Sequence, residues 1–145
     1  MSDWDFHNPF ILDVEVQQEH IDGLQHTNNG VYVSWCEEVA WAHSASLGLD
    51  LASYQRLNRA MVITNSEFDY LQASRCGDQL QVATWIVSWD AKLTMQRCFQ
   101  IVRPADKTTV LRARMKFACV ALDSGRPRRL PPEFIEGYGS ALLTA

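Results

Sequence analysis

The spacing of apolar residues changes along this chain, and the change restricts the folds that it can adopt. Between Asn29 and about Leu47, apolar side chains recur at i, i+3, i+4, i+7 and i+8, which places them on one face of a helix. Gly48 follows as a natural stop. The segment therefore predicts a helix of about 18 residues, roughly 27 Å long. Its apolar face consists of Tyr32, Trp35, Cys36, Val39, Ala40 and His43.

On both sides of this helix the period is that of β-strands. The clearest strand is Thr108–Leu122, in which apolar residues from Leu111 to Ala121 occupy every second position and basic residues begin the opposite row. We expect a loop over residues 50–59 and a short helix from Pro132 or Glu133. The other predicted strands are Phe10–Val16, Met61–Tyr70, Gln79–Trp89 and Leu93–Val102. About five antiparallel strands and one long helix predict an α+β domain whose sheet covers the helix.

Length and composition are those of one ordinary globular domain. The chain has 145 residues, of which 47% are hydrophobic and 21% charged, which is enough to bury a core. No apolar run approaches the roughly 18 residues of a membrane span, and the acidic N-terminus lacks the basic start and apolar core of a signal peptide. We therefore expect a single cytoplasmic domain over residues 1–145, with no membrane partner.

Several kinds of site have no support in the sequence. The cysteines Cys36, Cys76, Cys98 and Cys119 are widely spaced and form no C-x-x-C pair, so we interpret them as reduced, mostly buried small hydrophobes rather than zinc ligands or disulfides. There is no G-x-S-x-G motif of a serine hydrolase. The glycine-rich loops G-x-G-x-x-G and G-x-x-x-x-G-K-[ST] that bind nucleotide phosphates are absent as well.

The segment before the predicted helix combines an acid–base group with a helix start. Asp22 and His26 are four residues apart, and Asn28 and Asn29 follow at the helix boundary. Asparagine oxygens accept hydrogen bonds from the free N–H groups of a first turn. A helix N-terminus also presents unpaired N–H groups and a partial positive charge. Reactions that develop negative charge on a carbonyl oxygen require such donors, so the segment indicates acyl-transfer chemistry.

These residues resemble the pattern Asp-x-x-x-His-x-Asn-Asn-x-x-Tyr-x-x-aromatic of hotdog-fold acyl-CoA thioesterases, including the 4-hydroxybenzoyl-CoA thioesterase group. The match lies in residues 22–40 and extends more weakly through Asp69-Tyr70 and residues 77–80, which look like the family's turn into its third strand. The resemblance implies a hotdog fold, a curved antiparallel sheet of about five strands wrapped around one long central helix. It also implies hydrolysis of an acyl-CoA to the free acid and CoA, without a metal or organic cofactor.

The resemblance assigns catalytic roles to three residues. The acid four residues before the His is catalytic in the resembled enzymes, and this role falls on Asp22. An ionised carboxylate can deprotonate water or attack the thioester itself. His26 would hydrogen-bond the thioester carbonyl or orient the water, and the backbone N–H of Asn29 would polarise the carbonyl oxygen. The alternatives are a turn-forming Asp in an Asp-Gly pair and a polar loop histidine.

Other residues of the segment are candidate substrate contacts or mark departures from the pattern. Asn28 is expected to cap the helix. Tyr32 and Trp35 would line the acyl or pantetheine channel, or else belong to the core. His20 stands where many relatives carry a second acid, and Gln25 stands where they carry Gly, in which case Gly23 would supply the flexibility of the turn. A metal site made of His20, Asp22 and His26 is a minor alternative.

Charge is divided unevenly and suggests where the nucleotide end of CoA binds. Residues 1–55 hold nine acids and no Lys or Arg, a net −9, whereas residues 56–145 have a net +5. The basic half could receive a polyphosphate, although folding could equally mix the two halves on one surface. The overall charge of −4 argues against nucleic acid as the main partner. Lys92, after a tight turn, and Arg128 and Arg129, in a Pro-flanked loop, are the favoured phosphate contacts.

Assembly and two alternative functions complete the expectations. Phe10–Val16, Gln79–Trp89 and Thr108–Leu122 are expected to leave sheet edges exposed in a monomer, and hotdog relatives form dimers, often paired into tetramers, with active sites at subunit boundaries. We therefore expect a homodimer or homotetramer. The alternatives are a thioesterase acting on acyl-carrier protein and a non-catalytic acyl-CoA-binding subunit.

Overall fold

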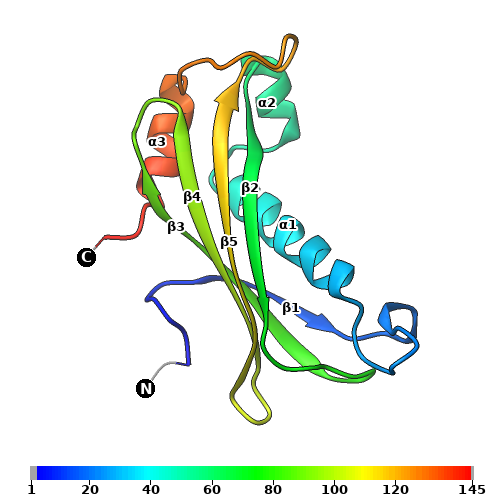
Figure 1. The fold of residues 1–145 in the computed structure, drawn as a ribbon. Coiled ribbons are helices and arrows are strands. Elements are labelled where there is room, and N and C mark those ends of the chain that lie inside the picture. The colour runs from blue at the N-terminus through cyan, green and yellow to red at the C-terminus, as the bar shows by residue number, and fades with distance from the viewer. Residues whose placement is uncertain (1–2, 145) are drawn as a thin grey trace. The chain divides into compact units, whose positions relative to one another are not determined.

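The computed structural model describes residues 3–144, and Figure 1 shows its helices and strands. One five-stranded sheet has the order β1-β3-β4-β5-β2. The strands are β1 Phe10–Glu15, β2 Ala60–Tyr70, β3 Gln79–Trp89, β4 Thr94–Arg103 and β5 Thr108–Val120. The helices are α1 Asn29–Ser46, α2 Leu51–Leu57 and α3 Pro132–Ser140, with a 3-10 turn at Gln18–His20. The predicted α+β class, the five strands and the long helix are confirmed.

Helix α1 and strand β5 bury the faces that their periods predicted. On α1 the side chains of Tyr32, Trp35, Cys36, Val39 and His43 are buried, and Ala40 is half-buried. Gly48 has φ +80°, a left-handed conformation that ends the helix segment. On β5 the row Leu111, Ala113, Met115, Phe117, Cys119 and Ala121 is buried, while Arg112, Arg114 and Lys116 are exposed.

The predicted loop over residues 50–59 is wrong, because Leu51–Leu57 forms α2. Asp50 caps this helix by accepting a hydrogen bond from Ser53 N–H at 2.9 Å. Asn58, with φ +52°, ends it in a left-handed conformation. A helix of seven residues spans only about two turns, which is too short for its apolar period to be recognised in the sequence.

The predicted exposed edges also need correction. Strands β3 and β5 lie inside the sheet, and its edges are β1 and β2. The order of strands in the sheet follows from the path of the chain rather than from any single strand's residues. Strand β2 exposes most of its length, including Val62 and Ile63. Strand β1 pairs antiparallel with the first half of β3, with Phe10 opposite Thr84 and Glu15 opposite Gln79.

Contacts divide the chain into two compact units. The first contains Met1–Ala40, Phe68–Thr84 and Phe99–Ala113, and the second contains Trp41–Glu67, Trp85–Cys98 and Arg114–Ala145. No helix within residues 3–144 is both long and apolar enough to cross a membrane.

In the first unit, the N-terminal segment is attached to β4 and β5. The side-chain amide of Gln100 donates to the Asp3 carbonyl at 3.1 Å and accepts from Asp5 N–H at 2.9 Å. Arg112 forms two hydrogen bonds with the Asp5 carboxylate, at 2.7 and 2.8 Å. This ion pair joins an acid of the acidic half to a base of the basic half, so folding does mix the two halves at this point.

The second unit has a buried polar cluster. The guanidinium of Arg97, which is 1% exposed, contacts His43 Nδ1 at 2.9 Å and donates to Ser44 Oγ at 3.2 Å. Ser44 Oγ also hydrogen-bonds the Tyr138 hydroxyl at 3.0 Å, and Tyr138 in turn hydrogen-bonds the Tyr54 hydroxyl. Burial, and to a lesser extent the positive charge of Arg97, lowers the pKa of His43 to about 4.

The cysteines are distributed between core and surface. Cys36 and Cys119 are buried, Cys98 is half-buried and Cys76 is exposed. Burial raises the pKa of the Cys36 thiol to about 12, so this side chain packs as a small hydrophobe. The exposed position of Cys76 differs from the mostly buried set that the sequence predicted.

Candidate active site

Residues 22–26 form a closed turn that holds the candidate catalytic acid. Asp22 N–H donates to the His26 carbonyl at 2.9 Å, and Gln25 N–H donates to the Asp22 carbonyl at 3.0 Å. The Asp22 carboxylate, through Oδ1, accepts from Leu24 N–H at 2.9 Å and from His26 N–H at 3.3 Å. The side chain thus closes the turn as an Asx motif, and the sequence spacing of four residues follows from this geometry.

The left-handed residue of this turn is Gln25, with φ +63°. Gly23 does not have a positive φ, and a Cβ added there would meet nothing within 4 Å. The idea that Gly23 replaces the missing glycine is therefore wrong, because Gln25 itself adopts the conformation that favours glycine.

The first turn of α1 presents a backbone donor beside this turn. Asn28 caps the helix, since its Oδ1 accepts from Gly30 N–H at 3.1 Å. Asn29 is exposed and is the first residue of α1. In the part of the chain that the structure describes, Asn29 N–H has no acceptor. An exposed N–H at a helix start can donate to an oxygen that gains negative charge.

A cavity of 340 Å³ brings these groups together within the first unit. It is lined by five residues that the sequence singled out, namely Asp22, His26, Asn28, Asn29 and Tyr32. The remaining lining residues are Leu24, Thr27, Tyr70, Leu71, Gln72 and Ala73. One wall is therefore the turn and helix start, and the other is the segment Tyr70–Ala73.

Sequence reasoning missed the second wall. Leu71 and Gln72 both donate their N–H groups to the Val110 carbonyl of β5, at 2.9 and 3.2 Å. Tyr70 lies beside Phe68 and Tyr32, with ring centroids 6.3 and 6.2 Å away. The one sequence signal for this wall was the weak match at Asp69-Tyr70, which correctly placed the end of β2 but not its position at the cavity.

Trp35 and His20 lie behind the cavity rather than in it. Trp35 is 6% exposed, and its ring meets those of Tyr32 and His20 edge-on at 5.8 and 5.3 Å. His20 Nδ1 accepts from Gln17 N–H at 2.9 Å, and its carbonyl accepts from Asn28 N–H at 2.8 Å. Trp35 thus takes the core position that its helical spacing allowed.

The residues predicted to bind the nucleotide end belong to the second unit. Leu130 N–H donates to the Lys92 carbonyl at 2.8 Å, which brings the turn after β3 next to the Pro- and Arg-rich stretch. The Arg129 carbonyl accepts from Arg59 Nε at 3.2 Å. The side chains of Lys92, Arg128 and Arg129 are exposed.

Within residues 3–144, no group of three His, Cys, Asp or Glu side chains is placed to hold a metal ion.

Comparisons with known proteins identify the family. The Thioesterase-like superfamily model matches residues 16–137. Protein THEM6 of Danio rerio is 32% identical over 72 residues, which cover 50% of this chain and 35% of that protein. The chain thus spans about a third of the length of this curated relative.

Two solved structures share the fold. Slr0204, a 1,4-dihydroxy-2-naphthoyl-CoA thioesterase from Synechocystis, has a TM-score of 0.81 at 20% identity, over 91% of this chain and 96% of that one. SAV2348 from Staphylococcus aureus, solved in complex with CoA, has a TM-score of 0.84 at 20% identity, over 99% and 92% of the two chains. These similarities confirm the predicted hotdog fold. With its family model matched over residues 16–137, the chain belongs to the Thioesterase-like superfamily.

Proposed function

We propose that this chain hydrolyses an acyl-CoA thioester to the free acid and CoA, and that residues 1–145 act as one thioesterase domain. The observation that carries the proposal is the cavity that gathers Asp22, His26 and the unpaired Asn29 N–H. A base or nucleophile and a donor for a carbonyl oxygen are the two groups that acyl transfer to water requires.

We assign to Asp22 the role of base or nucleophile in the attack on the thioester carbon. Its Oδ1 is engaged by two backbone N–H groups, and among the described residues no hydrogen bond reaches Oδ2. As a base, Oδ2 takes a proton from water while the water oxygen bonds to the thioester carbon. As a nucleophile, it bonds to that carbon itself and forms an anhydride that water then hydrolyses. The two routes share the same carboxylate position.

The start of α1 supports the charge that develops on the other side of the carbonyl. As the new C–O bond forms, the carbonyl electrons move to oxygen, where Asn29 N–H and the partial positive charge of the helix start stabilise them. When the intermediate collapses, the C–S bond breaks and the CoA thiolate leaves. On the base route the thiolate takes the proton that Asp22 removed from water, and on the nucleophile route it takes a proton from the water that hydrolyses the anhydride. His26, in the cavity wall, is placed to hydrogen-bond the carbonyl or the water.

The decisive experiment is thiol release measured with short, long, branched and aromatic acyl-CoAs, because the acyl group is not specified by the residues above. Turnover of at least one acyl-CoA that is lost in Asp22→Asn supports the proposal. Activity on acyl-carrier protein with little on any acyl-CoA would favour the alternative carrier. Tight acyl-CoA binding without thiol release would favour a non-catalytic binder.

We further propose that the CoA phosphates bind the surface formed by Lys92, Arg128 and Arg129. Two hydrogen bonds from a guanidinium to a phosphate are a strong and specific pairing. The backbone hydrogen bond between Lys92 and Leu130 joins the two segments that carry these cations, which supports the proposal. That SAV2348 was solved in complex with CoA supports a CoA-type ligand. We also propose that the protein acts in the cytoplasm and as a homo-oligomer.

A further inference from the structure

The two walls of the cavity are joined by one buried residue, Ser74. Its carbonyl accepts from Thr27 N–H at 2.8 Å and from Thr27 Oγ1 at 3.2 Å. Its hydroxyl contacts Thr27 Oγ1 at 2.7 Å and the Tyr32 hydroxyl at 2.6 Å. Ser74 is 0% exposed, and Thr27 and Tyr32 are each 3% exposed. These bonds link segments 47 residues apart in the sequence.

The protons of the three hydroxyl groups fit this arrangement. Each hydroxyl has one proton and can also accept. Thr27 Oγ1 donates to the Ser74 carbonyl, Ser74 Oγ donates to Thr27 Oγ1, and the Tyr32 hydroxyl donates to Ser74 Oγ. Every proton then has an acceptor. Loss of the Ser74 hydroxyl would leave the Tyr32 proton without an acceptor, and loss of the Thr27 hydroxyl would do the same to the Ser74 proton, at a cost of about 1–3 kcal/mol.

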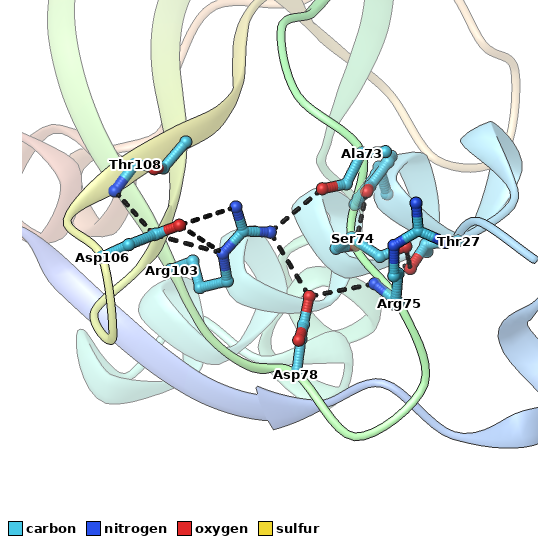
Figure 2. A network of polar contacts seen from close by, with 9 residues as sticks. Thr27, Ala73, Ser74, Arg75, Asp78, Arg103, Asp106 and Thr108 are labelled. Carbon is cyan, nitrogen blue, oxygen red and sulfur yellow. Dashed lines mark hydrogen bonds and ion pairs between the residues drawn. The ribbon is translucent and has the colours of Figure 1, made fainter.

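The segment that carries Ser74 is held by Arg103, which binds the preceding residue, Ala73 (Figure 2). Residues 71–78 contain no helix or strand, so side chains must fix their path. Arg103 of β4 donates to the Ala73 carbonyl at 3.0 Å and to the Asp78 carboxylate at 3.3 Å, while Asp78 accepts from Arg75 N–H at 2.9 Å. On its other side, Arg103 forms three contacts of 2.9–3.2 Å with Asp106.

This ion pair persists at neutral pH. The hydrogen bonds from Arg103 and Thr108 lower the pKa of Asp106 to about 2. The Arg103 side chain is only 19% exposed, so the pair is less screened by solvent than a fully exposed surface pair. We call the set Arg103, Asp106, Asp78, Ala73, Ser74 and Thr27 the Arg103 network.

We propose that Ser74, whose segment Arg103 anchors at Ala73 and Asp78, is a positioning residue for the proposed thioester hydrolysis, on which this inference rests. Thr27 lies directly between His26 and the cap residue Asn28. Its hydrogen bonds to Ser74 therefore fix the position of the Asp22 turn and of the start of α1 relative to the wall Tyr70–Ala73. A misplacement of about 1 Å can reduce turnover by about 10²-fold without removing any reacting group.

The test compares variants of the Arg103 network with matched controls in the 145-residue chain. Ser74→Ala and Arg103→Gln should lower kcat for the best acyl-CoA by about 10- to 100-fold, with KM changed by less than about 3-fold. Arg103→Lys should be intermediate, because one ammonium cannot reach all the acceptors of a guanidinium. The controls are Arg112→Gln, which breaks another Arg–Asp pair of the first unit, and Ser46→Ala, which removes another side-chain-to-backbone bond.

A second readout is independent of activity. Hydrogen exchange of peptides covering residues 22–30 should become about 10-fold faster in Ser74→Ala and Arg103→Gln, and should stay unchanged in both controls. If wild type releases no thiol but exchange responds in this way, the proposed function fails while the positioning of the loop stands. If wild type is active and Asp22→Asn is not, but Ser74→Ala and Arg103→Gln keep wild-type kcat, Ser74 is not a positioning residue.

Discussion

At the scale of single residues, Asp22 combines a structural and a chemical task. Asp22→Asn keeps the oxygen that accepts from Leu24 and His26 N–H, so the turn should survive. The amide cannot act as a base or a nucleophile, and kcat should fall by roughly 10²-fold or more. Steady-state thiol release checks this, with Asp13→Asn on strand β1 as the control. Near wild-type turnover in folded Asp22→Asn would reduce Asp22 to a turn residue.

A second residue-scale prediction concerns His43. A guanidinium only donates, so His43 Nδ1 at 2.9 Å from Arg97 must accept, and the ring is neutral. Burial, and then Arg97, lower its pKa from 6.5 to about 4. Between pH 6.5 and about pH 4, His43 binds a proton in the unfolded chain but not in the folded chain. The free energy of unfolding is therefore unaffected by His43 above about pH 6.5. As the pH falls toward 4, protonation of His43 in the unfolded chain lowers this free energy by up to about 3 kcal/mol.

His43→Gln keeps an acceptor for Arg97 but cannot titrate. Urea unfolding at pH 7, 6 and 5 should show that wild type loses more stability than His43→Gln over this interval. Equal losses in both proteins would mean that His43 is not held neutral by the fold.

At the scale of elements, the turn between β3 and β4 is closed by Asp90 and strained at Ala91. The Asp90 carboxylate accepts from the N–H groups of Lys92, Leu93 and Thr94 at 2.8, 2.8 and 3.0 Å. Ala91 has φ +60°, which costs an L-residue about 1 kcal/mol. Ala91→Gly should therefore stabilise the protein by about 0.5–1 kcal/mol in urea unfolding. The same change at Ala42, inside α1, should destabilise it by about 1 kcal/mol; a destabilised Ala91→Gly protein would contradict this account.

At the scale of the whole molecule, the edge strand β2 is the feature that points to assembly. It is 11 residues long, and Val62 and Ile63 are 39% and 41% exposed. A long edge with unpaired backbone groups and apolar side chains pairs readily with another strand. We expect at least a homodimer by light scattering at micromolar concentration. Ile63→Lys should give monomers, whereas Ile135→Lys on α3 should not. A monomeric wild type would exclude the proposed assembly.

The nucleotide end of the substrate gives a second prediction at this scale. Replacing Arg128 and Arg129 together by Ala should raise KM for an acyl-CoA much more than KM for the same acyl group on a short phosphate-free thiol, because guanidinium–phosphate pairing is lost only with CoA. Equal changes with both substrates would remove this surface from the CoA site.

Much of this protein can be predicted from local sequence because the relevant physics is local. The 3.6-residue period of residues 29–47 and the alternation in residues 108–122 determine which faces are buried, whatever surrounds them. The turn of residues 22–26, the Asn28 cap and the exposed Asn29 N–H involve residues within a few positions of one another. The resemblance to acyl-CoA thioesterases lay in the same segment and led to the correct fold.

Only the tertiary structure shows which segments distant in the sequence contact one another. No local spacing indicates that Tyr70–Ala73 forms the second wall, that Ser74 binds Thr27, or that Arg103 binds Ala73. Two of the three predicted edge strands, β3 and β5, were misassigned for the same reason, since the strand order depends on the course of the whole chain, whereas β1 is an edge as predicted. Residue spacing specifies which groups a segment presents, but only the folded path brings those groups within the 2.6–3.3 Å of a hydrogen bond.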